Sequence, residues 1–178
     1  MSARPIPRID APEGVTIRPA RPSDAASFRE MWVGVVAEQR YVRTAEVTRT
    51  VRSFKKGFRD AVTDDVANLM AVDASGRVVG NLYMERERHP VNHHVATLGM
   101  AIAPEWRGKG LGSALMSEAL RWAERVGVEK VALSVYPGNE AAIALYRKFG
   151  FEEEGRLVRQ SKKPYGYEDE VVMARFLR

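Results

Sequence analysis

The chain has 178 residues, of which 45% are hydrophobic and 29% are charged, a balance typical of a globular protein with its own core. The absence of cysteine excludes disulfides, thiolate catalysis and cysteine-based zinc sites. The formal net charge is +5, but lysines and arginines are dispersed among carboxylates, so we expect no nucleic-acid partner.

Membrane and secretory segments are not predicted either. No apolar run is long enough to cross a bilayer, and the N-terminus lacks the apolar region of a secretory signal. We therefore expect a cytoplasmic protein without a membrane partner.

The first sixty residues predict an arm, a strand and two helices. Residues 1–13 carry three prolines and little apolar content, so we expect a flexible or extended N-terminal arm. A short strand over 15–19 is followed by a helix that Ser23 or Asp24 caps and that ends near Arg40. A second helix is expected over 44–61, with an apolar face of Val47, Val51, Phe54 and Phe58.

The middle of the chain predicts three strands. Residues 67–73 and 77–84 are expected to pair across the turn Asp73-Ala74-Ser75-Gly76. The polar stretch 85–92 reads as a loop or strand extension, and residues 93–102 form a long strand.

The C-terminal part continues with two helices and three strands. A helix over 110–126 should end at Gly127, and a strand over 130–136 should lead to a short helix from Asn139 to Gly150. Two final strands are expected over 151–158 and 168–174. This order predicts an α/β fold in which a mixed central sheet of about seven strands carries helices on both faces. We find no linker, so residues 14–178 are expected to form a single domain.

A glycine-rich loop lies between the long strand and the helix over 110–126. Its glycines at 108, 110 and 112 lack a Cβ atom, so a ligand can approach the backbone closely. The first N–H groups of a helix have no internal partner, and the helix dipole is positive there. With Arg107 and Lys109 beside it, the loop predicts an anion site, most naturally for phosphate.

Three known glycine loops compete for this stretch. A P-loop fails, because Ala103 stands where its first glycine belongs and Gly110 stands where Ser or Thr should follow the lysine. The dinucleotide fingerprint fits poorly, because Ser113 takes the place of its third glycine. The pattern Arg/Gln-x-x-Gly-x-Gly/Ala is matched by Arg107, Gly110 and Gly112. A tight turn with solvated charges is the remaining alternative.

A second motif follows about thirty residues later. Asn139 and Tyr146 are seven residues apart and therefore share a helix face, with the small Ala142 between them. A tyrosine in such a position is more often a core or boundary residue. Its combination with the glycine loop makes Tyr146 a candidate catalytic residue.

These two motifs resemble those of the GNAT superfamily of N-acetyltransferases. The second motif is similar to the stretch Asn-x-x-Ala-x-x-x-Tyr-x-x-x-Gly-Phe of that family, and the order of elements is similar from Val15 onward. The resemblance implies acetyl-coenzyme A as co-substrate and no metal. It also implies that the strand before the loop splays from its neighbour, often at a β-bulge, and pairs with the pantetheine arm. The implied cofactor-binding residues are Met100, Ala101, Ile102, Arg107, Gly108, Lys109, Gly110, Leu111, Gly112, Ser113, Asn139, Ala142 and Tyr146.

The resemblance further implies a direct transfer, in which a substrate amine attacks the thioester carbon. A backbone N–H near Met100 or Ala101 would hold the oxyanion, and Tyr146 would protonate the leaving thiolate. Many members carry a glutamate where this chain has Thr97, so the usual general base is missing.

We interpret Glu38, near the end of the first helix, as one alternative catalytic base. The competing interpretation is a solvated surface carboxylate. Glu85 and Glu87 are weaker options. His89, His93 and His94 predict no metal site, because adjacent strand residues point to opposite faces; one of them is left as a possible proton relay or pocket residue.

The predicted function is N-acetylation of a small primary amine, because 88–96 and 165–174 look like the group that acetylates amino acids or related amines. Three alternatives stay open: a protein N-terminal or lysine acetyltransferase, a non-catalytic acyl-coenzyme A-binding module, and a nucleic-acid-binding protein. The resemblance also leads us to expect a homodimer, with the C-terminal strands as a candidate contact.

Overall fold

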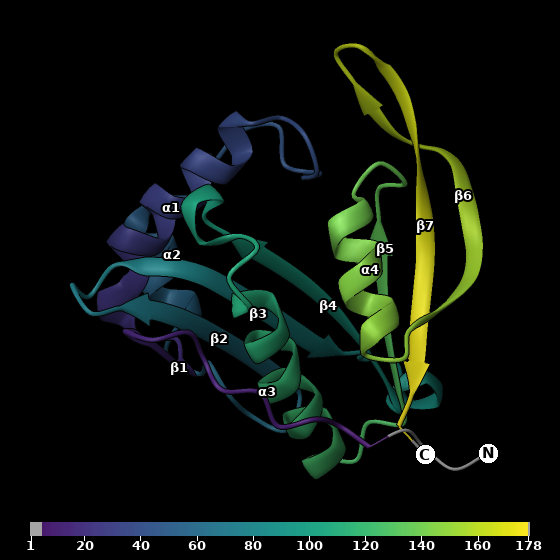
Figure 1. Ribbon diagram of the computed structural model, residues 1–178, viewed down its shortest axis with the longest axis horizontal. Coiled ribbons are helices and arrows are strands. Elements are labelled where there is room, and N and C mark those ends of the chain that lie inside the picture. Colours follow the sequence, from purple (N-terminus) through teal and green to yellow (C-terminus); the bar gives the residue numbers. More distant parts are fainter. Residues whose placement is uncertain (1–4, 178) are drawn as a thin grey trace.

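All strands of the computed structural model, which describes residues 5–177, belong to one seven-stranded sheet (Figure 1). Its order is β1-β2-β3-β4-β5-β7-β6, and neighbours are antiparallel except for the parallel pair β4–β5. The strands are β1 Val15–Pro19, β2 Val66–Asp73, β3 Val78–Arg86, β4 Val95–Ile102, β5 Lys130–Val135, β6 Glu152–Lys163 and β7 Gly166–Phe176.

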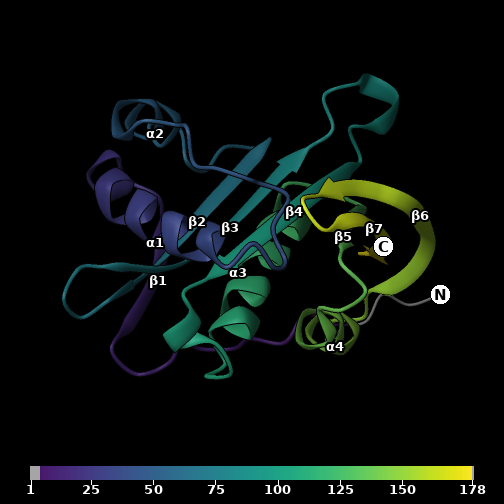
Figure 2. The ribbon, with the colours of Figure 1, turned by 90° about the horizontal axis from the view of Figure 1, so that it is seen from above.

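Helices cover both faces of the sheet, as the order of elements predicted. The helices are α1 Ala25–Ala37, α2 Val51–Gly57, α3 Leu111–Arg125 and α4 Glu140–Lys148. Figure 2 shows α1 and α2 on one side of the strands and α3 and α4 on the other. Within residues 5–177, none of these helices has the length and apolar character needed to cross a membrane. The mixed α/β architecture predicted from the sequence is confirmed.

Helix α3 supplies the larger of the two cores. Leu115 and Ala119 are fully buried against the sheet, and Trp122 donates its indole N–H to the Thr63 carbonyl at 2.9 Å. Gly127 ends the helix with a φ of 78°, a conformation that suits glycine. The helical periodicity of this stretch therefore predicted both its extent and its buried face.

Helix α2 is much shorter than the predicted helix over 44–61. It begins after Thr50, whose hydroxyl accepts the Ser53 N–H at 3.2 Å. The residues before it are irregular, because side chains bind their carbonyls: Arg29 donates to Val47 and Arg49, and Gln39 donates to Ala45. Helix α1 likewise ends at Ala37, a turn before the predicted end.

The C-terminal hairpin is longer than predicted. Strands β6 and β7 extend to a tip at Pro164 and Tyr165, whereas the sequence predicted strands over 151–158 and 168–174. Most of β6 is exposed, so its sequence carries little alternation. The register shifts between Leu157 and Ser161, where Arg159 has a φ of 54°.

The N-terminal arm is extended along α3. Residues 5–12 form no regular element, but Ile9 N–H donates to the Ser117 hydroxyl at 3.3 Å, and that hydroxyl donates to the Pro7 carbonyl at 2.7 Å. Ser117 is fully buried in α3 and needs these partners. Residues 5–12 of the predicted arm thus lie extended along the helix, and residues 1–4 of the arm lie outside the described residues.

Gly112 marks the place where α3 crosses α4 and β4. A Cβ atom there would lie 3.1 Å from Leu145 Cδ2 and 3.3 Å from Ile102 Cδ1. We expect Gly112→Val to lower the free energy of unfolding by about 1–3 kcal/mol, because the added methyl groups force the two helices apart.

Urea denaturation measures this effect, and Gly34→Ala is the matched control. Gly34 lies within α1, and a Cβ atom there meets nothing within 4 Å. The control should gain up to about 1 kcal/mol from helix propensity. A Gly112→Val protein as stable as the wild type would contradict this close crossing.

Candidate active site

A cleft opens where β4 and β5 part. The two strands pair only from Val95 to Thr97 against Lys130 to Ala132. Beyond that point β4 stays in continuous register with β3, and β5 stays paired with β7. The separation therefore occurs without a β-bulge in the β3–β4 ladder, unlike the arrangement that the resemblance often implies. The resulting cavity has a volume of about 670 Å³.

The predicted strand residues differ in what they offer to this cleft. Met100 and Ala101 line it, together with Leu98 and Gly99. The side chain of Ile102 packs against the core below α3, and its carbonyl accepts a hydrogen bond from Arg107 Nε at 3.0 Å. Backbone groups on the free edge of β4 are thus available opposite β5, as for an added strand.

The glycine loop leads directly into α3. Gly108 and Gly110 have φ values of 71° and 84°, which favour glycine. Gly110 is the N-cap and has no side chain to cap the helix, and the first helical bond joins Ala114 N–H to its carbonyl. The N–H groups of residues 111–113 precede that bond, so they suit an anion. Leu111 is 1% exposed and contributes only its backbone.

The two cations of the loop already have contacts. Arg107 donates to both oxygens of Glu38, at 2.8 and 2.7 Å. Lys109 Nζ lies 5.2 Å from the centre of the Trp106 ring. The Arg107 contact joins the end of α1 to the glycine loop, so a residue predicted for the acceptor side and one predicted for the phosphate side meet directly.

The second motif forms the wall of the cleft beside β5. Asn139 caps α4, with its side-chain oxygen accepting the Ala142 N–H at 3.3 Å, and it also lines the cleft. Tyr146 lines the same cleft, is 7% exposed, and packs against Phe151 with ring centres 5.9 Å apart. The structure thus brings Asn139, Tyr146 and Met100 to one cavity.

The phenol of Tyr146 is available as a hydrogen-bond donor in the cleft. Burial raises its pKa to about 12, so the hydroxyl stays protonated at neutral pH. Its hydroxyl has no hydrogen-bond partner within the described residues. A group bound in the cleft can therefore receive that hydrogen bond.

The carboxylates predicted as bases are not equivalent. The Arg107 hydrogen bonds hold the pKa of Glu38 below its usual value, and the Arg88 hydrogen bond does the same for Glu85. Both are therefore weaker bases than a free carboxylate. Glu87 contributes to a separate cavity of about 350 Å³ with Glu85 and His89.

One carboxylate that sequence reasoning missed lines the cleft itself. Glu170 of β7 is 2% exposed, forms an ion pair with Arg43, and accepts a hydrogen bond from the Ser161 hydroxyl at 2.8 Å. It lies in the acidic run after Tyr167, which reads as a solvated stretch. Strand alternation alone does not tell which of these carboxylates points inward.

The histidines are dispersed. His93 Nε2 lies 2.9 Å from Asp65 Oδ1. The turn Pro90–Asn92 precedes His93, so β4 begins at Val95 and not at residue 93 as predicted. Among residues 5–177, no group of three or more His, Asp or Glu side chains is arranged to hold a metal.

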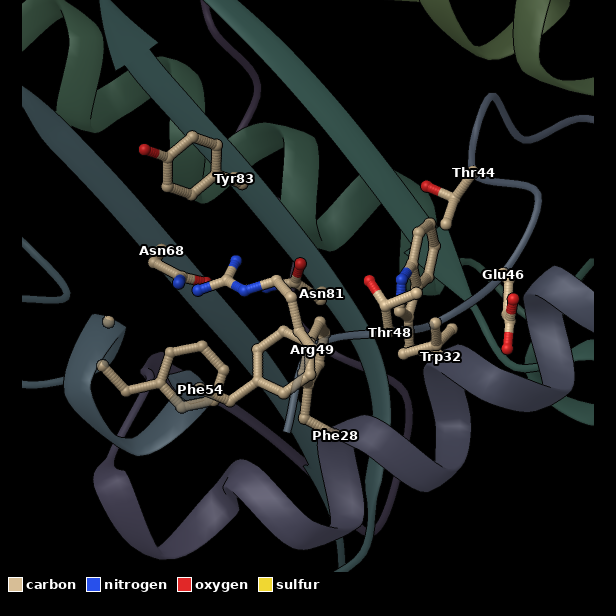
Figure 3. Close-up of a pocket in the computed structure, with 13 residues that line it drawn as sticks. Phe28, Trp32, Thr44, Glu46, Thr48, Arg49, Phe54, Asn68, Asn81 and Tyr83 are labelled. Atoms are coloured by element: carbon tan, nitrogen blue, oxygen red, sulfur yellow. The ribbon is translucent and has the colours of Figure 1, made fainter. Parts of the chain in front are cut away.

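A second cavity of about 590 Å³ lies between α1, α2 and the sheet (Figure 3). It shares Trp32, Thr44, Asn81 and Tyr83 with the cleft, so the two are continuous. Sequence reasoning missed this cavity. The sequence signal for it is an asparagine among the apolar residues in the middle of each of two strands, Asn68 in β2 and Asn81 in β3.

Comparison with known proteins agrees with this geometry. The model of the Acetyltransferase (GNAT) family matches residues 35–151, which is more than half of the chain. The fold and the cleft are thus those of an acetyltransferase scaffold. The chain belongs to the GNAT family.

Two curated relatives are similar over part of their length. The L-amino acid N-acetyltransferase AaaT of Escherichia coli is 35% identical over 101 residues, 56% of this chain and 62% of that protein. A mycothiol acetyltransferase of Salinispora arenicola is 31% identical over 150 residues, 83% of this chain and 48% of that protein. The matched region therefore spans about half to two-thirds of these relatives.

Solved structures match the whole fold. A GNAT acetyltransferase from Streptococcus pneumoniae is 26% identical with a TM-score of 0.84, covering 92% of this chain and 99% of that one. A phosphinothricin acetyltransferase from Sinorhizobium meliloti, in complex with acetyl-coenzyme A, is 26% identical with a TM-score of 0.79, covering 92% and 89%.

The Glu38–Arg107 pair generates a test. We expect Glu38→Gln to tighten coenzyme A binding by about 1.4- to fivefold, because the exposed pair of ~0.2–1 kcal/mol no longer competes with phosphate for Arg107. Calorimetry with coenzyme A measures this. Glu105→Gln, an exposed carboxylate just before the loop, is the control and should leave the affinity unchanged.

The same variant tests the predicted catalytic role. Unchanged coenzyme A affinity combined with a lower kcat and a lost acidic limb in the pH profile would contradict the counter-ion role and support Glu38 as the general base.

Proposed function

We propose that this protein transfers the acetyl group of acetyl-coenzyme A directly to the primary amine of a small molecule, an amino acid or related amine. The observation that carries the proposal is the cleft between β4 and β5, which is lined by a protonated, unpartnered Tyr146. The loop of residues 107–113 is suited to the pyrophosphate, and the free edge of β4 is suited to the pantetheine arm.

The residues divide the chemistry between them. The backbone near Met100 and Ala101 is suited to hold the thioester carbonyl and the oxyanion that forms on amine attack. Tyr146 then gives its proton to the departing thiolate, and Asn139 keeps the start of α4 in place beside it.

The proton that the amine loses needs an acceptor. Glu38 is one candidate, although Arg107 lowers its pKa. Glu170 is the other, because it lines the cleft and is nearly fully buried. A water chain to either carboxylate serves the same purpose.

Contacts across the rim of the cleft favour a small acceptor over a protein. Tyr41 donates its hydroxyl to the Gly138 carbonyl at 2.6 Å, and Lys163 donates to the Val42 carbonyl. Arg43 reaches Glu170 beside them. These bonds join the segment after α1 to the loop before α4 and to the C-terminal hairpin. They narrow the opening of the cleft on the side where a polypeptide would enter. The name of the E. coli relative, an L-amino acid N-acetyltransferase, agrees with a small acceptor.

Tyr146→Phe tests the acid. We expect kcat to fall by roughly 10²-fold or somewhat less, the lower end of general acid catalysis, with coenzyme A affinity within a few fold. The loss should shrink for acyl donors with a more acidic thiol. For a given donor, the fold loss in kcat should stay constant from about pH 7 to about pH 9.5, because the pKa of Tyr146 is raised to about 12.

Free-thiol release across a panel of amines is the measurement for the reaction and for this variant. Equal losses for every donor thiol would reduce Tyr146 to a positioning role. Full activity of the Phe variant would assign the acid to another group.

We also propose a homodimer that uses the C-terminal hairpin. Strand β6 is at the edge of the sheet, and Val158 and Tyr167 are 72% and 56% exposed. The strand has 12 residues and presents unpaired backbone groups, and Leu157 and Val158 form an exposed apolar patch within its otherwise polar sequence, so this part of the edge is suited to pair with another copy.

Val158→Glu tests this surface. We expect a dimer mass for the wild type in light scattering and a monomer mass for the variant at the same concentration, because a charge is buried in the contact. Val91→Glu, at a site that is 71% exposed, is the control and should remain dimeric. A monomeric wild type would contradict the dimer.

A further inference from the structure

The cavity between α1, α2 and the sheet carries an arginine without an acidic partner. Arg49 lies in the irregular segment before α2, with its guanidinium 4.6 Å from the centre of the Phe54 ring. In the described residues no carboxylate is within ion-pair distance of it. Figure 3 shows the guanidinium pointing into the cavity, toward the Asn68 amide. Because the guanidinium stacks on the Phe54 ring, its N–H groups can donate hydrogen bonds into the cavity.

The floor of the cavity adds a buried amide. Asn68 is 8% exposed, and its oxygen accepts a hydrogen bond from Asn81 Nδ2 at 2.8 Å. Asn81 Nδ2 also donates to the Leu69 carbonyl. These bonds leave the Asn68 Nδ2 group as a donor facing the cavity beside Arg49. Two kinds of hydrogen-bond donor therefore converge there.

Aromatic, threonine and acidic side chains form the rest of the wall. Phe28 and Phe54 are buried, with ring centres 5.0 Å apart, and Trp32 continues this wall to the cleft. Glu46 is the carboxylate of this lining, and Figure 3 shows it on the far side of Trp32 from Arg49. The cavity thus has a positive end, an aromatic middle and an acidic end next to the cleft.

We propose that this cavity binds the acceptor and that Arg49, with Asn68, receives an anionic group of the acceptor, a carboxylate or a similar planar oxyanion. The proposal rests on the proposed acetyl transfer for the orientation of the acceptor. The amine enters the cleft past Asn81 and Thr44, where Glu46 favours a cation. The apolar body lies against Phe28 and Trp32, and the anion lies at the far end. The acceptor is therefore an amine with an apolar body and an acid group.

Matched pairs of amines test this specificity. The probes are phenylalanine with phenethylamine, and 6-aminohexanoate with hexylamine, in a free-thiol release assay. We expect the wild type to have at least tenfold higher kcat/KM for at least one acid than for its neutral partner. Arg49→Gln should lower kcat/KM for that acid by roughly 10- to 100-fold, the effect of a charge-assisted hydrogen bond, and should change the neutral amine by less than twofold.

Two further variants sharpen the assignment. Arg49→Lys should recover part of the loss, because it restores the charge but not the planar fork. Arg52→Gln removes a positive charge of α2 that is also exposed, and it should have no effect, because Arg52 does not line the cavity. Equal losses for acid and amine in Arg49→Gln would overturn the proposal, as would a wild type that prefers both neutral partners.

An equilibrium measurement separates this proposal from the proposed reaction. Calorimetric binding of phenylalanine and of 6-aminohexanoate is compared between wild type and Arg49→Gln with coenzyme A present, a state in which no acetyl transfer occurs. Tenfold weaker binding of either acid by the variant supports the anion site even if no amine is acetylated. Undetectable binding of both acids by the wild type, or equal affinity in both proteins, contradicts the proposed anion site. Acetyl transfer is then judged separately, by the thiol-release assay.

Discussion

The functional architecture depends on the short parallel contact between β4 and β5. Each of these strands pairs over a longer stretch with its other neighbour. Strand β4 pairs with β3 from Ala96 to Ile102, and β5 pairs with β7 over its whole length. Antiparallel ladders are slightly more stable per residue than parallel ones, so the sheet separates at its parallel pair. The separation leaves polar backbone groups facing a cavity, and such groups are costly unless water or a ligand pairs with them.

This separation also sets where the chemical groups come from. The start of α3 lies near the end of β4, because only the short turn Pro104–Trp106 and the glycine loop join them. Helix α4 follows β5 in the same way, which carries Tyr146 to the opposite wall. The bond from Arg107 Nε to the Ile102 carbonyl fixes the loop to the strand, and its contact with Glu38 fixes the loop to α1. Arg107 therefore joins the proposed donor side of the site to the proposed acceptor side.

The sequence predicted the parts of the site that are made of backbone. A glycine with positive φ, such as Gly110, and a small residue at a close crossing, such as Gly112, have few substitutes, so their spacing identifies the loop. Tyr146 was proposed from the fixed spacing that its motif gives it from Asn139, and it lines the cleft in the structure. The length of α2 was not predictable, because the helical spacing of Val47 and Val51 competes with side-chain bonds from distant Arg29.

The parts made of side chains were missed for a related reason. Asn68 and Asn81 are polar residues in apolar strands, which signals a site but not its ligand. Arg49 carries no signal at all, because an arginine in an irregular segment is ordinarily solvated, and only the folded chain stacks it on Phe54. Glu170 could not be distinguished from the neighbouring carboxylates in the sequence, because its burial depends on the pairing of β7 with β6, where Ser161 donates to it.

The donor and acceptor halves of the proposed site therefore tolerate change differently. The donor half relies on backbone N–H groups and on glycines, so substitution there alters the loop itself. The acceptor half is held by bonds from Arg29 and Gln39 to the carbonyls of Ala45, Val47 and Arg49, which leave the side chains of that segment free to vary. A residue such as Thr48 or Arg49 can be exchanged without moving the backbone that carries it. In the function proposed here, the same scaffold keeps one acyl donor, and a few exposed side chains between α1 and α2 select the acceptor.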